Sequence, residues 1–274
     1  MYFSSVPFSG IVVTYNEDRY LSRCLDRLSF CEQLIVIDLG STDYSIDIAK
    51  KHRAEIIHHE WVPVVEEIRQ KAVNYARNNW IVFLDPDEIF PDQISPLLSE
   101  VIYQSPNLAA IRIPWRYYFK GKPVRGTIWG KKTYKKVIIH KSRVLFPKNV
   151  HRGIKVKEGY TSVNFPYKHE YTILHYWCDS HKQLFRKHWR YLKKEGEARY
   201  RIGERFHLLH GLIQTFSSFK KDLIDHQGFK SGSQGIFLSL FHATYILMCQ
   251  FSLWQYQLKA RSSFSKYPFH KKMH

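Results

Sequence analysis

The sequence predicts an α/β fold with a mostly parallel, doubly wound sheet, because strand patterns alternate with amphipathic helix patterns over its first hundred residues. The clearest strand is Trp80–Leu84, an apolar run without a charge. Such a run is typical of a parallel strand that is buried on both faces. Earlier strands are expected at 11–13, 33–37 and 55–58. This alternation favours a sheet flanked by helices.

Helix patterns separate these strands. The first follows Asn16, Glu17 and Asp18, which suit a helix start, and the second should begin at Ser41 or Thr42 as its N-cap. The third should run from about Pro63 to Asn78. The expected inward faces are spaced at helical intervals. They comprise Leu21, Cys24, Leu25 and Leu28, then Ile46 and Ala49, then Val65, Ile68, Ala72, Tyr75 and Ala76.

Charge is distributed unevenly along the chain, whose formal net charge is +18. The first hundred residues carry more acids than bases, whereas residues 101–157 contain no Asp or Glu. This division suggests a metal-using site followed by a surface that recognises an anion. The basic segment reads as strands around 111–120 that join the parallel set. Its lysines could equally form an ordinary solvated face: Lys131, Lys132, Lys135 and Lys136, around Tyr134.

A cluster of carboxylates follows the Trp80 strand directly. Asp85, Asp87 and Glu88 arrive together, and Pro86 stops the strand. The carboxyl ends of parallel strands are where open α/β sheets bind ligands. Crowded carboxylates need a cation or hydrogen-bond donors, and oxygen ligands suit Mg²⁺ or Mn²⁺. A solvated acidic turn is the alternative interpretation.

Three motifs carry a resemblance to a known family. They are Val12-Val13-Thr14-Tyr15-Asn16-Glu17, then Val36-Ile37-Asp38-Leu39-Gly40-Ser41-Thr42-Asp43, then Phe83-Leu84-Asp85-Pro86-Asp87-Glu88. Each follows or ends a predicted strand, and their order and spacing resemble the family 2 glycosyltransferases. The resemblance implies the GT-A fold, a Rossmann-like sheet, and a nucleotide-diphosphate sugar as donor.

The resemblance also implies roles for individual residues. Arg69 stands where the family often has Arg-Asn, although Gln70 replaces the Asn here. A helix-entry role for Asp38 and a solvated position for Arg69 remain the ordinary alternatives. The residues implied to bind the nucleotide sugar are Thr14, Tyr15, Asn16, Glu17, Asp38, Gly40, Ser41, Arg69 and Asp85. The residues implied to hold Mg²⁺ or Mn²⁺ are Asp85, Asp87 and His175.

The catalytic base is harder to assign. The segment 145–154 resembles a Val-His-Glu element of the lipopolysaccharide-core-type branch, but Arg152 stands where that element has Glu. The nearest later carboxylates are Glu158, Glu170 and Asp179. Transfer to an acceptor hydroxyl requires a group that takes its proton. The candidate catalytic residues are Asp87, Glu88 and Glu158.

From Ser180 onward the pattern is helical and basic. Leu184, His188, Tyr191 and Leu192 are expected on one face, and a turn is expected over Gly228–Gly235. The apolar segment Ile236–Leu253 borders on the length of a membrane span. Its polar interruptions and its aromatic, basic tail suit an interfacial helix better, and a buried helix is the third alternative. The Gly-Phe-x-x-Gly-x-x-Gly arrangement again resembles the lipopolysaccharide-core-type branch.

These observations predict a GT-A domain over 1–179, with a donor half at 1–100 and an acceptor half at 101–179, and a basic helical region over 180–274. The expected function is metal-dependent, inverting sugar transfer to an anionic or lipid-linked glycan at a membrane surface. The location expected is cytoplasmic, peripheral on the inner face of the membrane, with reduced cysteines and no signal peptide. A non-catalytic GT-A-like binder of anionic glycans or membranes is the alternative. No nucleic-acid motif occurs, so nucleic acid is not an expected partner.

Overall fold

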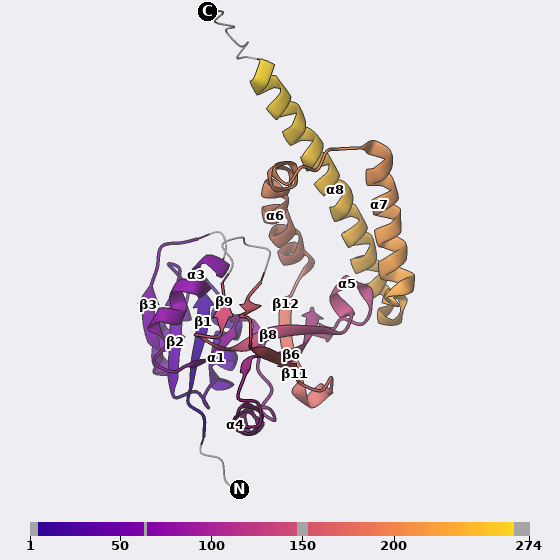
Figure 1. The fold of residues 1–274 in the computed structure, drawn as a ribbon. Helices are drawn as coiled ribbons and strands as arrows, with labels where there is room; N and C mark the ends of the chain where they lie inside the picture. The colour runs from indigo at the N-terminus through magenta and orange to yellow at the C-terminus, as the bar shows by residue number, and fades with distance from the viewer. Residues whose placement is uncertain (1–4, 63–64, 147–152, 266–274) are drawn as a thin grey trace, which may run out of the picture. The chain divides into compact units, whose positions relative to one another are not determined.

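The computed structural model describes residues 5–62, 65–146 and 153–265 (Figure 1). Two compact units make up the chain. The first comprises residues 1–116 and 132–177, and the second comprises residues 117–131 and 178–274. The carboxylate motifs therefore belong to the first unit, and the apolar segment 236–253 belongs to the second.

Four parallel strands begin the sheet, as the sequence predicts. They are β1 (Phe8–Thr14), β2 (Gln33–Asp38), β3 (Glu55–His58) and β4 (Trp80–Leu84), in the order β3-β2-β1-β4. Every residue of β1 and β4 is buried, because the apolar runs pack against helices on both faces of the sheet. One expectation needs refinement: β4 is parallel to β1 but antiparallel to its other neighbour, β8 (Thr133–His140).

The sheet continues as β4-β8-β6-β12-β5, which makes it mixed. The long strand β6 pairs antiparallel with β8. The strand expected around 111–120 therefore does join the sheet that contains the parallel strands. Short strands β9 and β10 form a separate pair. The remaining strands are β5 (Glu88–Ile89), β6 (Leu108–Phe119), β7 (Lys122–Pro123), β8 (Thr133–His140), β9 (Val144–Leu145), β10 (Lys155–Val156), β11 (Thr161–Asn164) and β12 (Ile173–Cys178).

The helices of the first unit are α1 (Asp18–Asp26), α2 (Ser45–Lys51), α3 (Val65–Ala72) and α4 (Ser95–Tyr103). The inward face predicted for α1 is confirmed by the burial of Leu21, Cys24, Leu25 and Leu28. The start predicted for α2 is wrong. The helix begins at Ser45, because Ser41 and Thr42 are held in the preceding loop by bonds to Asn16.

The predicted helix 63–78 is shorter than expected. It passes after Ala72 into a 3₁₀ helix, Val73–Tyr75. A 3₁₀ helix has three residues per turn instead of 3.6, so the side chains of Val73 to Tyr75 point in other directions than an α-helix would give them. Tyr75 is consequently 48% exposed, although Ile68, Ala72 and Ala76 are buried as predicted.

The second unit is helical, as predicted from residue 180 onward. Its helices are α5 (Thr127–Gly130), α6 (His181–Arg201), α7 (Leu208–Lys220) and α8 (Gly232–Ser265), with a π-helical turn (Lys221–Asp225) and a 3₁₀ helix (Gly228–Ser231) before α8. Ser180 caps α6 by accepting a hydrogen bond from the N–H of Gln183 at 3.1 Å. Leu184 of α6 is buried, but Tyr191, predicted on the same face, is 45% exposed.

The turn predicted over Gly228–Gly235 ends early, because α8 already begins at Gly232. Close packing explains the glycines of this segment. A Cβ atom on Gly235 would lie 1.8 Å from the backbone oxygen of Gly228. A Cβ atom on Gly126, whose φ is +71°, would lie 2.5 Å from the backbone of Gln227. The glycine pattern therefore brings three backbone segments together around the start of α8.

Candidate functional site

The carboxyl ends of β2, β1 and β4 meet at one edge of the sheet. Thr14 at the end of β1 is the register partner of Asp38 at the end of β2, and Val12 is the partner of Leu84 at the end of β4. The three motifs identified in the sequence therefore lie together. Such an edge is where open α/β sheets bind ligands.

The loops after β1 and β2 are tied to each other. The Ser41 hydroxyl accepts a hydrogen bond from the N–H of Asn16 at 3.0 Å, and the Asn16 side-chain oxygen accepts one from the N–H of Thr42 at 2.7 Å. The Ser45 hydroxyl accepts from the N–H of Glu17 at 3.1 Å. Asn16 adopts a left-handed backbone, with φ 55°. Asn16 and Tyr15 remain exposed on this loop pair, as a binding surface requires.

Asp38 is 2% exposed and shapes the second loop. Its two carboxylate oxygens accept hydrogen bonds from the N–H groups of Gly40 and Ser41, at 3.1 and 3.0 Å. Gly40 has a φ of +87°, which a side chain would disfavour. The ring nitrogen Nδ1 of His58 lies 3.5 Å from the Asp38 carboxylate. Asp38 therefore fixes the backbone conformation of this loop from its buried side.

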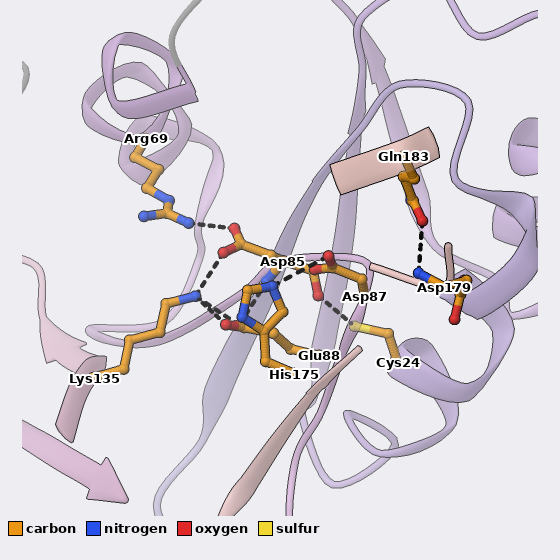
Figure 2. A network of polar contacts seen from close by, with 9 residues as sticks. All are labelled: Cys24, Arg69, Asp85, Asp87, Glu88, Lys135, His175, Asp179 and Gln183. Atoms are coloured by element: carbon orange, nitrogen blue, oxygen red, sulfur yellow. Dashed lines mark hydrogen bonds and ion pairs between the residues drawn. The ribbon is translucent and has the colours of Figure 1, made fainter. Parts of the chain in front are cut away.

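Asp85 is held by two cations (Figure 2). The Arg69 guanidinium donates to one of its carboxylate oxygens, and Nζ of Lys135 lies 2.6 Å from the other. Lys135 also contacts both oxygens of Glu88, at 2.5 and 2.6 Å. Glu88 is fully buried, and its carboxylate accepts a further bond from the N–H of Asp85 at 3.0 Å. These four side chains form one connected ion-pair network, in the order Arg69–Asp85–Lys135–Glu88.

Strand register explains why Lys135 reaches this site. Val82 of β4 is the antiparallel partner of Ile138 of β8, so continuing the register brings Lys135 opposite Asp85. The sequence interpretation of Lys135 as part of an outward basic surface is therefore wrong. Its neighbour Lys136 turns elsewhere and donates to the backbone oxygen of Ile154. Successive side chains of β8 point to opposite faces of the sheet, so only one of the two lysines reaches Asp85.

The network shifts the pKa values of its two carboxylates in opposite directions. Burial by itself would raise the pKa of Asp85, but Lys135 and then Arg69 outweigh that effect and hold the pKa well below its usual range. Burial raises the pKa of Glu88, with the charge of Asp85 adding to the effect. Burial would lower the pKa of Lys135, yet Asp85 and Glu88 raise it. Lys135 and Asp85 are accordingly charged at neutral pH.

Asp87 turns toward a different partner, His175 of β12 (Figure 2). Nε2 of His175 lies 3.2 Å from a carboxylate oxygen of Asp87, and the Asp87 backbone oxygen accepts from the N–H of Tyr176 at 2.8 Å. The imidazole stacks on the Trp115 indole at 4.8 Å with a 9° interplanar angle. Lys135 lies 5.2 Å from the centre of the same indole. Trp115, which the sequence analysis did not single out, therefore links the two halves of the site.

The residues present fit a divalent cation in part. Two neighbouring ligands of an octahedral ion with bonds of about 2.1 Å lie about 3 Å apart, close to the Asp87–His175 separation. Asp85, also expected to bind metal, is instead engaged by Arg69 and Lys135. Across residues 5–62, 65–146 and 153–265, no group of three or more His, Cys, Asp or Glu side chains is placed to hold a metal. A cation here would take its other ligands from a diphosphate and water.

The candidate catalytic residues are not gathered at one point. Glu88 has no exposed surface. Glu158 lies on the exposed turn after β10, and within the described chain it shares no ion pair with the cluster. Asp87 keeps 15% of its side chain exposed. The element around His151 and Arg152 lies outside the described residues.

The strand-end loops, Asp85 with its partners Arg69 and Lys135, and the Asp87–His175 pair lie at one edge of an α/β sheet. The sequence profile described as Glycosyl transferase family 2 matches residues 9–173, which is more than half of the chain. The protein belongs to this family. The α/β fold expected from the resemblance, with its helical C-terminal region, is confirmed.

Two relatives illustrate the similarity. The chain is 24% identical over 160 residues to the lipopolysaccharide core biosynthesis glycosyltransferase LpsC of Rhizobium meliloti (strain 1021), covering 56% of this chain and 58% of LpsC. It is 32% identical over 95 residues to the SPbeta prophage-derived glycosyltransferase SunS of Bacillus subtilis (strain 168), covering 34% of this chain and 22% of SunS. The chain therefore matches well under two thirds of either relative.

Solved structures with a similar fold include glucosyl-3-phosphoglycerate synthase from Mycobacterium tuberculosis in complex with Mn²⁺, uridine diphosphate and glucosyl-3-phosphoglycerate. That comparison has a TM-score of 0.34 and 20% identity and covers 42% of this chain and 45% of the synthase. S. aureus TarS gives a TM-score of 0.38 and 17% identity, over 50% of this chain and 29% of TarS.

Proposed function

We propose that this glycosyltransferase moves a sugar from a nucleotide-diphosphate donor to an acceptor hydroxyl on a lipid-linked or lipopolysaccharide-type glycan. The observation that carries the proposal is the Asp87–His175 pair. It lies beside Asp85, which is paired with Lys135, at the sheet edge where the three sequence motifs meet. The relationship to LpsC, a lipopolysaccharide core biosynthesis enzyme by name, supports the acceptor class.

The donor lies, in this proposal, over the paired loops after β1 and β2. The residues proposed to contact it are Tyr15, Asn16, Glu17, Gly40, Ser41, Arg69 and Asp85, while Thr14 and Asp38, which are 1% and 2% exposed, support these loops from the inside. The exposed N–H and side-chain groups of these loops suit a nucleoside, and Arg69 supplies positive charge next to the diphosphate. Lys135 and Glu88 keep Asp85 and Arg69 fixed before the donor arrives.

Asp87 and His175 would hold Mg²⁺ or Mn²⁺, which would stabilise the charge that develops on the leaving diphosphate. His175 is oriented by its stacking on Trp115, so both ligands are preorganised. Asp85 takes part through Arg69 and Lys135 instead of binding the cation directly.

Inversion is the expected stereochemical outcome. The acceptor oxygen attacks the anomeric carbon, the bond from that carbon to the diphosphate oxygen breaks, and a carboxylate takes the hydroxyl proton. Of the candidates, Glu158 and Asp87 have exposed surface, whereas Glu88 has none and serves to hold Lys135. Glu158 is therefore the first base to test by substitution.

The predicted domains keep their roles in this proposal: 1–100 binds the donor, 101–179 receives the acceptor, and 180–274 attaches to the cytoplasmic face of a membrane. The segment Gly228–Ala260 is long and apolar enough to cross a membrane by length and composition, since it contains an 18-residue stretch with a mean hydropathy of 1.6. Six large apolar residues recur on the exposed side of α8 at helical spacing: Ile236, Leu240, Leu247, Phe251, Trp254 and Leu258. This stripe extends about 33 Å at 1.5 Å per residue.

A titration calorimetry series tests the function directly. Uridine and guanosine diphosphates are titrated with and without Mn²⁺, and a screen of nucleotide sugars follows for slow donor hydrolysis. Metal-dependent binding of one diphosphate, with hydrolysis of the matching sugar nucleotide, is expected. The rival function is a non-catalytic binder of anionic glycans, which the occupation of Asp85 by Lys135 favours. Failure of every diphosphate to bind would leave that rival standing.

A further inference from the structure

Helix α7 turns its apolar residues outward. It lies alongside α8 within the second unit (Figure 1). Five large aliphatic and aromatic residues of α7 are between 39% and 73% exposed, and they recur on one side of the helix: Leu208, Leu209, Leu212, Ile213 and Phe216. In a protein surrounded by water, the outward side of such a helix is expected to be polar.

The side of α7 that faces α8 is small and polar. Gly211 is buried, and a Cβ atom there would lie 3.1 Å from Cγ of Gln250. Gln250 is itself 3% exposed, and its amide donates a hydrogen bond to the side-chain oxygen of Gln214 at 2.6 Å. The hydroxyl of Thr215 donates back to the Gly211 oxygen at 2.9 Å. The polarity of α7 is thus inverted relative to that of a water-soluble helix.

One part of the contact between α6 and α8 follows the same rule, while aromatic side chains such as Phe185 and Phe241 pack together in the rest of it. A Cβ atom on Gly196 would lie 2.3 Å from the backbone oxygen of Ser252, and the Ser252 hydroxyl donates to the backbone oxygen of Leu192 at 3.2 Å. Helices that associate in lipid meet through small residues and interhelical hydrogen bonds, because apolar side chains gain nothing by leaving lipid. The packing inside this unit therefore suits an apolar surrounding on its outer side.

Charge points to an anionic lipid surface. No Asp, Glu, Lys or Arg occurs from Leu208 to Phe219, and none occurs from Gly232 to Leu258. The charged residues next to α7 are mainly basic and lie at its two ends, with Arg205 before it and Lys220 and Lys221 after its apolar residues. Basic residues that flank an apolar helix face contact anionic headgroups while that face enters the bilayer.

The geometry favours lying on the membrane over crossing it. At thirteen residues, α7 is about 20 Å long, whereas the hydrocarbon layer is about 30 Å thick. Helix α6 also packs along α8, and it carries many charged residues, which are costly to place in a bilayer core. Those charges are Arg186, Lys187, Arg190, Lys193 and Lys194.

We infer that the outward side of α7 inserts into the surface of an anionic bilayer and that α8 lies along that surface without spanning it. This inference deepens the membrane location proposed above and does not depend on the transfer reaction. A second copy of this chain is the other occupant that could cover α7, and the experiment below separates the two.

The test is flotation of the full-length protein with phosphatidylethanolamine–phosphatidylglycerol vesicles. Replacing Leu212, Ile213 and Phe216 together by Gln should lower the partition coefficient on the order of 100-fold, since each inserted apolar side chain contributes up to about a factor of ten. The control changes three other exposed residues to Gln in the first unit, at Tyr75, Tyr103 and Leu145, which are 48%, 46% and 51% exposed. The control should bind as the wild type does. The single change Ile213→Gln, expected to weaken partition by about a factor of ten, replaces the triple variant if the latter does not fold.

Four results would overturn the inference. If the α7 variant floats as the wild type does, α7 does not insert, although the membrane location survives. If the wild type does not float, both fail. If light scattering shows a wild-type dimer that the α7 variant dissociates, with flotation unchanged, a second copy covers α7. Extraction of membranes with alkaline carbonate should release the protein, and retention would mean that α8 spans. Donor hydrolysis is measured separately on the same variants, so failure of the transferase proposal would be a distinct result.

Discussion

Lys135 determines how the acidic cluster divides its work. Its ammonium group lies between Asp85 and Glu88 and neutralises part of their charge. Asp85 is paired with Arg69 as well as with Lys135. Asp87, which lies beside His175, is therefore the carboxylate that we propose to bind a divalent cation. A single buried lysine thus leaves Asp87, and not Asp85, as the aspartate of the Asp-Pro-Asp motif that we propose to bind the metal.

Replacing Lys135 by Met should destabilise the first unit strongly. Two buried or half-buried carboxylates would lose a shared partner, and such a loss costs about 3 kcal/mol or more. Adding Glu88→Gln to that variant should restore part of the loss, because one uncompensated charge disappears. The free energy of unfolding in denaturant measures both effects. Lys132→Met is the matched control, since Lys132 is exposed beside the Tyr167 ring. A loss that deepens when Glu88 is neutralised would contradict the pairing.

Asp87→Asn tests the other half of the site. The change preserves size but removes the charge that would help to hold the cation, so the transfer rate should fall on the order of 10²-fold or more, as for removal of an electrostatic stabiliser. The affinity for Mn²⁺ in the presence of nucleotide diphosphate should fall with it. Turnover and calorimetry supply the two readouts. Asp47→Asn, at an exposed position of α2, should leave both unchanged. If the Asp87 variant turned over as fast as the wild type, the Asp-Pro-Asp motif would be only a structural turn with no part in the transfer.

Among single residues, the sequence predicts the positions of the aspartates but not that of Lys135, because Lys135 reaches the site through long-range strand pairing. Asp38 and Asp85 stand out in the sequence because each ends or follows an apolar strand, and strand ends converge. Lys135 lies fifty positions after Asp85 and reaches it only because β8 runs antiparallel to β4 in one particular register. Nothing near Lys135 in the sequence distinguishes it from Lys136, which points elsewhere.

Among the elements, the apolar runs gave reliable strands, whereas helix ends depended on tertiary contacts. β4 occupies the predicted residues because every position in it is buried. The start of α2 was misplaced because Ser41 and Thr42, good caps by composition, bond to the neighbouring loop. The start of α8 at Gly232 likewise depends on backbone packing at Gly228 and Gly235 that sequence periodicity does not record.

The close contact between α6 and α8 allows a direct test by one methyl group. In an exposed helix, Gly→Ala should stabilise by about 1 kcal/mol. At Gly196 the added Cβ would lie 2.3 Å from the Ser252 oxygen, so Gly196→Ala should instead destabilise the pair by about 1–3 kcal/mol. Faster hydrogen exchange of the α6 and α8 amides would report this separation of the helices. Lys194→Ala, at an exposed position of the same helix, should not accelerate exchange. Slower exchange in the Gly196 variant would mean that the helices are not in contact.

For the molecule as a whole, the two units differ in the surroundings that they suit. The first unit buries its apolar residues in two clusters on either side of a sheet. The second exposes long apolar sides on α7 and α8 and carries many bases on α6. The formal net charge of +18 was visible in the sequence, but the outward direction of the apolar residues was not, because it depends on which sides of the three helices meet.

Membrane binding should therefore have two separable components. Lys and Arg near an anionic surface contribute about 1 kcal/mol each, and this attraction is screened over a Debye length of about 10 Å at 0.1 M salt. Contact of the apolar sides with lipid is not screened in this way. We expect raised salt to release part of the protein from phosphatidylglycerol vesicles and detergent to release the remainder. Phosphatidylcholine vesicles should bind less protein, with little dependence on salt. A salt series in sedimentation assays measures both components. Complete release by salt would show that the apolar sides do not enter the bilayer, and binding to both vesicles that ignores salt would show that the basic residues do not contribute.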